Sequence, residues 1–385
     1  MKLERFLEDA RESYMGLKLR EIKHRFVYKK YSKRMAQGLE RYMASKVKKP
    51  HVQIRREIRL CKAVWGCYPL HYYRYDLYQK NKEMGDGELT DYIPEFFFYH
   101  LFLPFHDSGE YDIVLNDKNL MELVFRSLHI PQPETVFKLI RNRLFTKELK
   151  EIAHDAMEGM LKNCKYRKIF LKPVDGDGGH GIFIFHRNDM GEYILNNGTV
   201  LDTCFLQRIG SEKDYIAQAG VEQTRELMEI YPCSVNTFRL VTENKDGMVR
   251  SLCAILRMGR DGREVDNASQ DGLFIRIDMD TGELGDWAYN EIMECFSHHP
   301  DTNIPFQGRC IPRWSDIKAF VETCAGKLSQ FTYLGWDIAL EEEGPLALEV
   351  NRSFGLDLLQ IALGGLREVF GIEDPAFYWR NRGER

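Results

Sequence analysis

The chain has 385 residues, of which 44% are apolar and 29% are charged, and its formal net charge is −4. This composition suits a folded protein with enough apolar content for two domains. It contains no apolar run near the roughly 20 residues that cross a bilayer, and its charged first residues lack a signal peptide's apolar core. Nine scattered cysteines without a CxxC pair disfavour a disulfide framework or a structural zinc site. We therefore expect a cytoplasmic protein.

Positive charge is concentrated in the first part of the chain. Residues 1–62 contain 19 Lys and Arg against 7 Asp and Glu, whereas the remainder contains 35 against 51. Such a basic segment can contact nucleic acid, an anionic membrane or an acidic protein, or it can be a solvated helix face. No nucleic-acid-binding motif accompanies it, so we expect no nucleic-acid partner. Peripheral contact with a membrane or a protein stays open as an alternative.

The first predicted elements are helices. Residues 1–47 contain no proline and repeat apolar residues at helical spacing, which predicts one or two helices ending before Pro50. Residues 64–105 are dense in aromatic side chains, as is typical of a helical subdomain that packs against a neighbour. A platform for stacking bases or binding sugars is the alternative interpretation of this segment.

Two amphipathic helices are predicted next. Asp117 is the expected N-cap of the first. The apolar stripe of this helix is predicted to consist of Leu120, Leu123, Val124 and Leu128. Prolines 131 and 133 end it, and a second helix is expected at about 146–163.

Beyond residue 166 the pattern changes to strands. The predicted strands are RKIFLKP, GIFIFHR, FLQRI, NTFRLVT, SLCAILRMG, LFIRIDMD, and the pair GWDIAL and LALEVN. A last helix is predicted in SDIKAFVETCAGKLSQF. Most of these strands follow one another as hairpins with a few helices between them, which favours an α+β fold over a doubly wound sheet.

A glycine-rich stretch, KPVDGDGGHG, separates two of these strands. Its glycines 176, 178, 179 and 181 can fold into a nest of backbone amides that binds phosphate, and Lys172 adds a positive charge beside it. The stretch matches neither a P-loop nor a Rossmann fingerprint. A plain hairpin turn is the alternative, and a glycine-rich hairpin that covers a nucleotide is the interpretation we carry forward.

The pair GWDIAL and LALEVN predicts a hairpin with an oxygen-rich face. Glu349 and Asn351 are two residues apart on a strand and therefore share a face. A turn near Glu343, with Gly344 as its left-handed residue, places Asp337 opposite Glu349. The neighbours expected to point into apolar packing are Trp336, Ile338, Leu348 and Val350. Two carboxylates and an amide suit Mg²⁺ beside nucleotide phosphates, and a solvated sheet face is the alternative.

Two arginines lie on predicted strands between the glycine stretch and this hairpin. Arg239 is in NTFRLVT and Arg257 is in AILRMGR. An inward-pointing strand arginine needs an anion, which a triphosphate or a transferring phosphoryl group would supply. An ordinary cross-strand salt bridge is the alternative.

Taken in order, these motifs form a known pattern. A DK before a helix, IPQPET, a strand ending in KP, a glycine-rich hairpin, paired strand arginines, a VDN loop, and GWD followed by LEVN resemble the ATP-grasp superfamily. The likeness begins near Trp65 and is greatest to the sugar-transfer-associated, alpha-L-glutamate ligase-related branch. It implies an α+β fold in which two lobes sandwich a nucleotide, preceded by a helical extension. The domain boundaries expected from it are 1–108, 109–209 with the glycine loop, and 210–385 with the metal ligands.

The resemblance also implies roles for individual residues. Lys118 and Lys172 would contact the phosphates of ATP, and the loop glycines Gly176, Gly178, Gly179 and Gly181 would close over them. The hinge strand would be FLQRI, where Gln207, Arg208 and Ile209 present backbone to adenine. Mg²⁺ would be held by Asp337, Glu349 and Asn351, and the catalytic charges would be Arg239, Arg257 and Lys172. No acidic residue is identified for the ribose.

The activity that the resemblance implies is an ATP- and Mg²⁺-dependent carboxylate–amine ligase that works through an acyl phosphate. Its partners would be a small-molecule carboxylate and an amine or sugar-linked acceptor, in glycan or cell-surface polysaccharide biosynthesis. A phosphotransferase on the same fold and a non-catalytic module that binds a nucleotide or a partner are the two alternatives.

Overall fold

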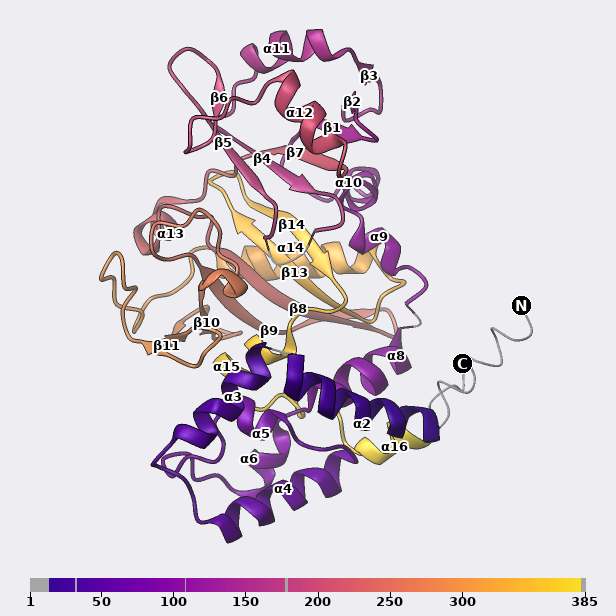
Figure 1. Cartoon of the computed structure of the whole chain (residues 1–385), viewed down its shortest axis with the longest axis vertical. Coiled ribbons are helices and arrows are strands. Elements are labelled where there is room, and N and C mark those ends of the chain that lie inside the picture. The colour runs from indigo at the N-terminus through magenta and orange to yellow at the C-terminus, as the bar shows by residue number, and fades with distance from the viewer. Residues whose placement is uncertain (1–13, 32, 108, 177–178, 382–385) are drawn as a thin grey trace, which may run out of the picture.

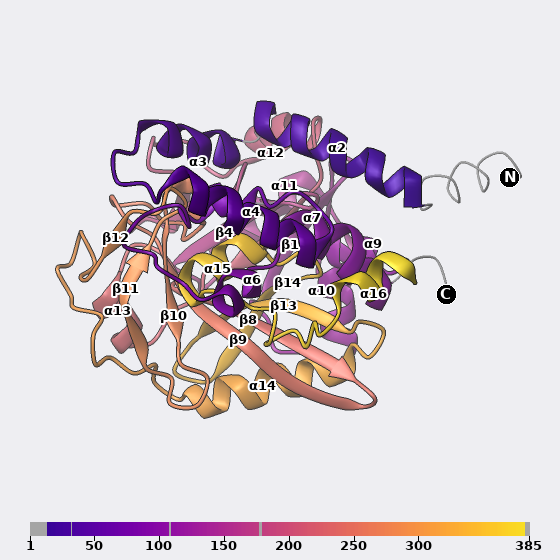
Figure 2. The same cartoon turned by 90° about the horizontal axis from the view of Figure 1, so that it is seen from below.

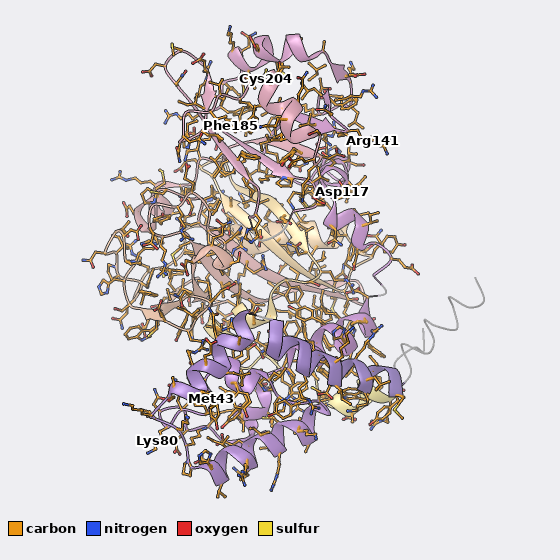
Figure 3. All side chains as sticks on the ribbon, viewed as in Figure 1. Met43, Lys80, Asp117, Arg141, Phe185 and Cys204 are labelled. Atoms are coloured by element: carbon orange, nitrogen blue, oxygen red, sulfur yellow. The ribbon has the colours of Figure 1, made fainter. Side chains whose placement is uncertain are left out.

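The computed structural model describes residues 14–31, 33–107, 109–176 and 179–381, without the side chains of residues 26–31, 33–35, 154 and 155. Figure 1 shows three parts stacked along the long axis: a helical base, a central sheet and an upper sheet. Asp117 lies at the level where the upper and central parts meet (Figure 3). Among the described helices, none has both the length and the apolar character needed to cross a bilayer.

The helical base is built from the N-terminal part of the chain. Its elements are α2 (Tyr14–Tyr31), α3 (Lys33–Ala44), α4 (His51–Trp65), α5 (His71–Arg74), α6 (Asp86–Asp91), α7 (Glu95–Phe97), the π-helical turn η1 (Phe98–Phe102) and α8 (Leu103–His106). The described helices α2 and α3 end before Pro50, as predicted. The nine cysteines, all within the described residues, are unpaired thiols.

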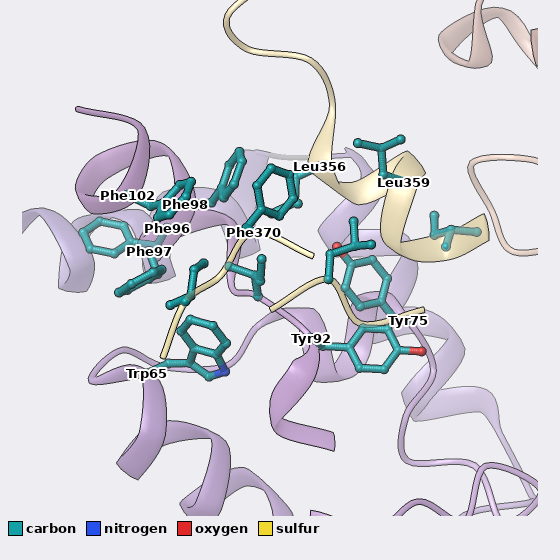
Figure 4. Packing of buried hydrophobic residues seen from close by; sticks show 14 of the residues in the cluster. Trp65, Tyr75, Tyr92, Phe96, Phe97, Phe98, Phe102, Leu356, Leu359 and Phe370 are labelled. Atoms are coloured by element: carbon teal, nitrogen blue, oxygen red, sulfur yellow. The ribbon is translucent and has the colours of Figure 1, made fainter. Parts of the chain in front are cut away.

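The aromatic segment forms the core of this base. Figure 4 shows Trp65, Tyr75 and Phe98 packed with Leu356 and other C-terminal residues that return to the base. The C-terminal helices α15 (Leu356–Leu363) and α16 (Pro375–Arg380) contribute to this packing. The predicted packing of a helical subdomain is confirmed, because most of these rings are buried against one another rather than presented to a ligand.

The upper sheet consists of seven described antiparallel strands in the order β3-β2-β1-β7-β4-β5-β6. Its strands are β1 (Thr135–Ile140), β2 (Arg143–Phe145), β3 (Glu151–Ile152), β4 (Lys168–Pro173), β5 (Phe183–Arg187), β6 (Tyr193–Ile194) and β7 (Tyr215–Ala219). Helices α11 (His154–Lys162) and α12 (Thr203–Gly210) lie on its far side (Figure 1). Strand β7 lies between β1 and β4, so the boundary expected after residue 209 would separate it from its own sheet.

Two sequence predictions in the upper part are wrong. FLQRI is not a strand but part of α12: the side chain of Asp202 accepts a hydrogen bond of 2.7 Å from the backbone N–H of Phe205 and starts a helix. Its buried residues Phe205, Leu206 and Ile209 follow helical spacing. The helix expected at 146–163 is present only as α11, which begins at residue 154, because residues 151–152 pair with β2 as strand β3.

The central sheet also has seven described antiparallel strands, in the order β12-β11-β10-β9-β8-β13-β14. They are β8 (Thr237–Lys245), β9 (Met248–Met258), β10 (Leu273–Ile277), β11 (Leu284–Tyr289), β12 (Cys295–Phe296), β13 (Tyr333–Leu340) and β14 (Pro345–Asn351). Helix α14 (Trp314–Lys327) packs against β8, β9 and β13, and α15 packs against β9 and β10. The short elements α13 (Arg225–Ile230) and η2 (Ala268–Gln270) lie in the connections.

Helix α10 (Lys118–Ser127), preceded by the short α9 (Asp112–Asn116), leads from the helical base to β1 and contacts both sheets. The side chain of Asp117 accepts hydrogen bonds from the backbone N–H groups of residues 119 and 120, which confirms the predicted N-cap. The predicted apolar stripe is confirmed only in part: Val124 and Leu128 pack against the core, but Leu120 is 39% exposed, and the fully buried apolar residues are Met121 and Phe125. The buried face also contains Glu122, which pairs with Lys138 of β1, so a polar contact contributes to the orientation of the helix.

The packing of strand β13 against Phe354 can be tested at Gly335. A Cβ added at Gly335 would lie 2.0 Å from Cβ of the buried Phe354. We expect Gly335→Ala to lower the free energy of unfolding by about 1–3 kcal/mol through overpacking. Gly326→Ala in α14 is the control, because its new Cβ would have only Val249 Cγ2 at 3.8 Å nearby, and alanine favours a helix by up to about 1 kcal/mol. Urea unfolding measures both, and equal midpoints for the two variants would contradict the packing argument.

Candidate functional site

A cleft of about 530 Å³ lies between the upper and central sheets, a volume usual for small-molecule sites. Strand β4, the glycine loop and β7 line it from the upper sheet, and β8, β9, β13 and β14 line it from the central sheet. The connection between β9 and β10 completes the wall with residues 264–269. Residues from distant parts of the sequence therefore meet in one space.

Four cationic side chains line this cleft: Lys118, Lys172, Arg239 and Arg257. Lys118 Nζ donates a hydrogen bond of 2.5 Å to the carbonyl oxygen of Gly176 in the glycine loop and lies 3.4 Å from Glu349 Oε1. Lys172 Nζ donates to Gln218 Oε1 at 3.0 Å, and burial lowers the pKa of Lys172 to about 8. Six carboxylates line the same cleft, those of Glu264, Asp266, Glu291, Asp337, Glu349 and Asp357. Cations and carboxylates that face one volume suit an anionic ligand bound together with a metal cation.

The arginines share one carboxylate. Arg239 Nε and Nη2 donate to the two oxygens of Asp337 at 2.5 and 3.0 Å, and Arg257 Nη2 donates to Asp337 Oδ2 at 3.1 Å. Burial by itself would raise the pKa of Asp337, but Arg239 and Arg257 hold it below its usual value. Arg239 and Asp337 are direct cross-strand neighbours, so the salt bridge considered as an alternative is present in the cleft itself.

The β13–β14 hairpin has the predicted pairing with one difference. Asp337 lies opposite Glu349, and Gly344 in the turn has a positive φ of 146°, both as expected. The register then shifts, so that Ile338 pairs with Ala347 and leaves Leu348 as the extra residue of a bulge. The prediction that Leu348 points into apolar packing is wrong, because the bulge turns it into the cleft.

The oxygen groups of this hairpin fit a magnesium ion that is shared with a nucleotide. Asp337, Glu349 and Asn351 all line the cleft. Glu349 Oε1 lies 3.4 Å from Lys118 Nζ, whereas both oxygens of Asp337 already accept hydrogen bonds from arginines. Among the described residues, no three His, Cys, Asp or Glu side chains form a metal site by themselves. Mg²⁺ commonly takes one or two carboxylates and completes its shell with phosphate oxygens and water, which matches this donor set.

The glycine loop approaches the central sheet from above. Gly176 and Gly179 line the cleft. Gly181 has a φ of +75° and packs beside Pro173 without being among the lining residues, and Gly178 lies outside the described residues. Gly179 has a φ of +73°, and a Cβ there would lie 2.1 Å from Asn267 Nδ2 on the opposite lobe. The two lobes therefore touch at a position where only glycine fits without displacing a neighbour.

The contact between the glycine loop and Asn267 can be tested at Gly179. We expect Gly179→Ala to weaken MgATP binding about tenfold, because Asn267 must move and the positive φ adds strain. Gly198→Ala is the matched control, since Gly198 has a φ of +82° with no other atom within 4 Å of the new Cβ. Isothermal titration with MgATP compares the two. Similar losses of affinity in both variants would trace the effect to backbone strain and would contradict a role for the lobe contact.

The predicted hinge residues are not brought to the cleft. Gln207, Arg208 and Ile209 belong to α12, and none of them is a lining residue. The residues that line the cleft at the end of strand β7, where the chain leaves the upper sheet, are Gln218, Ala219 and Val221. All five residues of β7 are buried. A short apolar run, YIAQA, inside an otherwise charged segment was the signal that could have found this strand.

A buried polar network behind the arginines was also missed. Arg257 Nε and Nη2 donate to Thr237 Oγ1 at 3.0 and 2.9 Å, and the Thr237 hydroxyl donates to Asp266 Oδ2. Burial raises the pKa of Asp266, which lies 3.5 Å from Arg257 Nε. Asp266 precedes Asn267 in the VDN stretch, and that stretch was the available signal. The network holds Arg257 in one orientation toward the cleft.

Two antiparallel sheets that face each other across a cleft lined by cations and carboxylates, with a glycine-rich hairpin over it, have the architecture of the ATP-grasp fold. A family model described as sugar-transfer associated ATP-grasp matches residues 100–370. The chain belongs to this family, and its α+β fold is an ATP-grasp fold with an N-terminal helical region.

Solved structures of other ATP-grasp proteins resemble it at low identity. D-alanine–D-alanine ligase from Bacillus anthracis is 13% identical, with a TM-score of 0.36 over 70% of this chain and 69% of that chain. D-cycloserine synthetase DcsG is 12% identical, with a TM-score of 0.40 over 69% and 70%. N5-carboxyaminoimidazole synthase from Aspergillus clavatus is 13% identical, with a TM-score of 0.38 over 70% and 55%. No curated protein matches the sequence.

Proposed function

We propose that this protein is an ATP- and Mg²⁺-dependent ligase that joins a carboxylate to an amine or a related nucleophile through an acyl phosphate. The observation that carries the proposal is the meeting of the four cations with Asp337, Glu349 and Asn351 in one cleft of about 530 Å³. Triphosphate needs the positive charge, and a bound Mg²⁺ needs the oxygen ligands. The family of the chain supports the same class of activity.

The adenine is best accommodated beside β7. Phe170 and Leu348 offer apolar surface from the two lobes, and Ala219 and Val221 form the connecting edge. We therefore assign the adenine contact to the segment 218–221 in place of Gln207, Arg208 and Ile209. The phosphates would then extend toward Lys118 and Lys172, beneath the glycine loop that contains Gly176 and Gly179.

The remaining side chains of the cleft would bind the metal and the phosphates. Glu349, Asn351 and Asp337 would hold Mg²⁺, which when bound offsets the negative charge of the transferring phosphoryl group. Lys172 and the arginines Arg239 and Arg257 would hold the phosphate oxygens in place and stabilise the charge that develops on them. The Asp337 carboxylate has a second function, because it fixes both guanidinium groups before substrate arrives.

The proposed reaction consists of a phosphoryl transfer and then an acyl transfer. A carboxylate oxygen of the first substrate attacks the γ-phosphorus, the bond to the β-phosphate oxygen breaks, and ADP leaves. The nitrogen of the second substrate then attacks the acyl carbon, phosphate leaves, and the nitrogen loses a proton. Closure of the glycine loop over the cleft would exclude water, which would otherwise hydrolyse the acyl phosphate.

The family and the cysteines support a proposal for the setting of the reaction. We propose that the acceptor is an amine or a sugar-linked group, in glycan or cell-surface polysaccharide biosynthesis, because the matching family is described as sugar-transfer associated. Nine unpaired thiols suit a reducing compartment, so we place the reaction in the cytoplasm.

Product mass tests the proposal. The protein is incubated with ATP, Mg²⁺ and fractions of a metabolite and nucleotide-sugar extract, and new masses are matched to consumed ones. A ligase forms ADP, phosphate and a product equal in mass to two metabolites less one water. A product heavier by one phosphoryl group would show a phosphotransferase instead. MgATP binding without consumption in any fraction would contradict a ligase acting on these metabolites.

A further inference from the structure

Helix α2 has an inner face that attaches it to the helical base. Helix α2 lies in the helical base (Figure 1), and the view in Figure 2 shows it along an outer edge of the molecule. On its inner face Leu17 and Glu21 are buried, and Lys18 donates a hydrogen bond to the carbonyl oxygen of Gly66. The Lys18 ammonium also lies 4.0 Å from the ring centre of Trp379. These contacts attach the inner face of α2 to the base and do not involve its opposite face.

The opposite face is apolar and exposed. Met15, Leu19 and Ile22 are 68%, 61% and 44% exposed, and their spacing of four and three residues places them in one row, which we call the outer stripe. The exposed residues Arg20 and Lys23 lie on the same helix beside it. Exposed apolar residues that gather in one place mark interaction sites more often than singly scattered ones do, so the outer stripe indicates a second contact.

We propose that the outer stripe docks on the surface of an anionic lipid bilayer. A bilayer offers an apolar phase for Met15, Leu19 and Ile22 and anionic headgroups for Arg20 and Lys23, and the two contributions add. Nucleic acid offers phosphates without an apolar phase. A stable protein interface buries roughly 800 Å² on each partner, which is more than three side chains supply.

The charge distribution of the chain orients this contact. Residues 1–62 carry 19 Lys and Arg against 7 Asp and Glu, whereas the remainder carries 35 against 51. An anionic surface therefore attracts the end that bears α2 and repels the two sheets. The contact is peripheral and reversible, and added salt weakens it because the Debye length falls to about 3 Å at 1 M. The inference is independent of the reaction catalysed in the cleft.

Vesicle sedimentation with the full chain tests the proposal. Vesicles of phosphatidylcholine with about a third phosphatidylserine are compared with pure phosphatidylcholine. We expect binding to the anionic vesicles only, about tenfold weaker in Met15→Glu and in Leu19→Glu. The matched control is Met190→Glu, at a methionine that is 77% exposed in the upper sheet region and that acquires the same charge. Thermal unfolding confirms that the variants are folded.

Three results would overturn the proposal. The first is absence of binding by the parent chain to the anionic vesicles. The second is equal binding by the Met15→Glu and Met190→Glu variants, which would leave the outer stripe without a role. The third is binding to duplex DNA that exceeds binding to vesicles and is the same in Leu19→Glu, which would make the basic end a nucleic-acid contact.

Discussion

Replacing Glu349 by glutamine is expected to reduce Mg²⁺-dependent ATP consumption by roughly 100-fold or more, the scale on which single electrostatic groups contribute to phosphoryl transfer. Glu349 Oε1 lies 3.4 Å from Lys118 Nζ, whereas both oxygens of Asp337 already accept hydrogen bonds from arginines. Glutamine keeps the shape but removes the charge that Mg²⁺ requires. Initial rates measured against Mg²⁺ concentration should show both a lower maximum and a higher half-saturating concentration.

The control for this variant is Glu343→Gln, in the turn of the same hairpin and exposed. It should leave the magnesium dependence unchanged. Asp337→Asn should also abolish ATP consumption but should in addition lower stability by about 3 kcal/mol, because Arg239 loses its buried carboxylate partner. Arg257 keeps Asp266 at 3.5 Å. Normal magnesium dependence in Glu349→Gln would show that the metal is held elsewhere.

The affinity for MgATP is expected to fall as the pH rises above about 8. The pKa of Lys172 is lowered to about 8 by burial, so in the free protein this side chain is charged below that pH and neutral above it. Phosphate binds the charged form, and binding at higher pH must therefore take up a proton. The dissociation constant should rise by up to about tenfold per pH unit, the limit for one linked proton.

The Lys172→Met variant isolates this effect. Without an amine at position 172 the affinity should already be low at pH 7 and should change little between pH 8 and 9. Lys213→Met serves as the control, because Lys213 is an exposed lysine of the upper sheet region paired with Asp175. Isothermal titration in buffers of different ionisation enthalpy reports the proton uptake directly. If Lys172→Met kept the pH dependence of the parent, the titrating group would have to be another one.

Sequence patterns predicted correctly those features that depend on residues close together in the chain. The cap at Asp117 depends on an oxygen that reaches amides two and three residues ahead. The pairing of Asp337 with Glu349 follows from a short turn and a period of two. The order of motifs along the chain, from the glycine stretch to the GWD and LEVN strands, then indicated the family, which the family model over residues 100–370 confirms.

Prediction failed where distant residues decide the outcome. FLQRI has the composition of a strand, yet the cap at Asp202 and burial against the upper sheet make it a helix. Leu348 alternates as an inward residue, yet a bulge of one residue turns it to the cleft. Strand β7 could not be found locally because its partners β1 and β4 are 42 residues or more away along the chain, and no local window contains them.

The sequence by itself thus determined the fold class, the family and the residues that carry charge to the cleft. Tertiary structure alone decided which strand connects the lobes, which carboxylate is already engaged by arginines, and how far Lys172 departs from its ordinary pKa. The physical reason is that residue type sets what a side chain can do, whereas desolvation and pairing depend on neighbours that only the folded chain brings within a few ångströms.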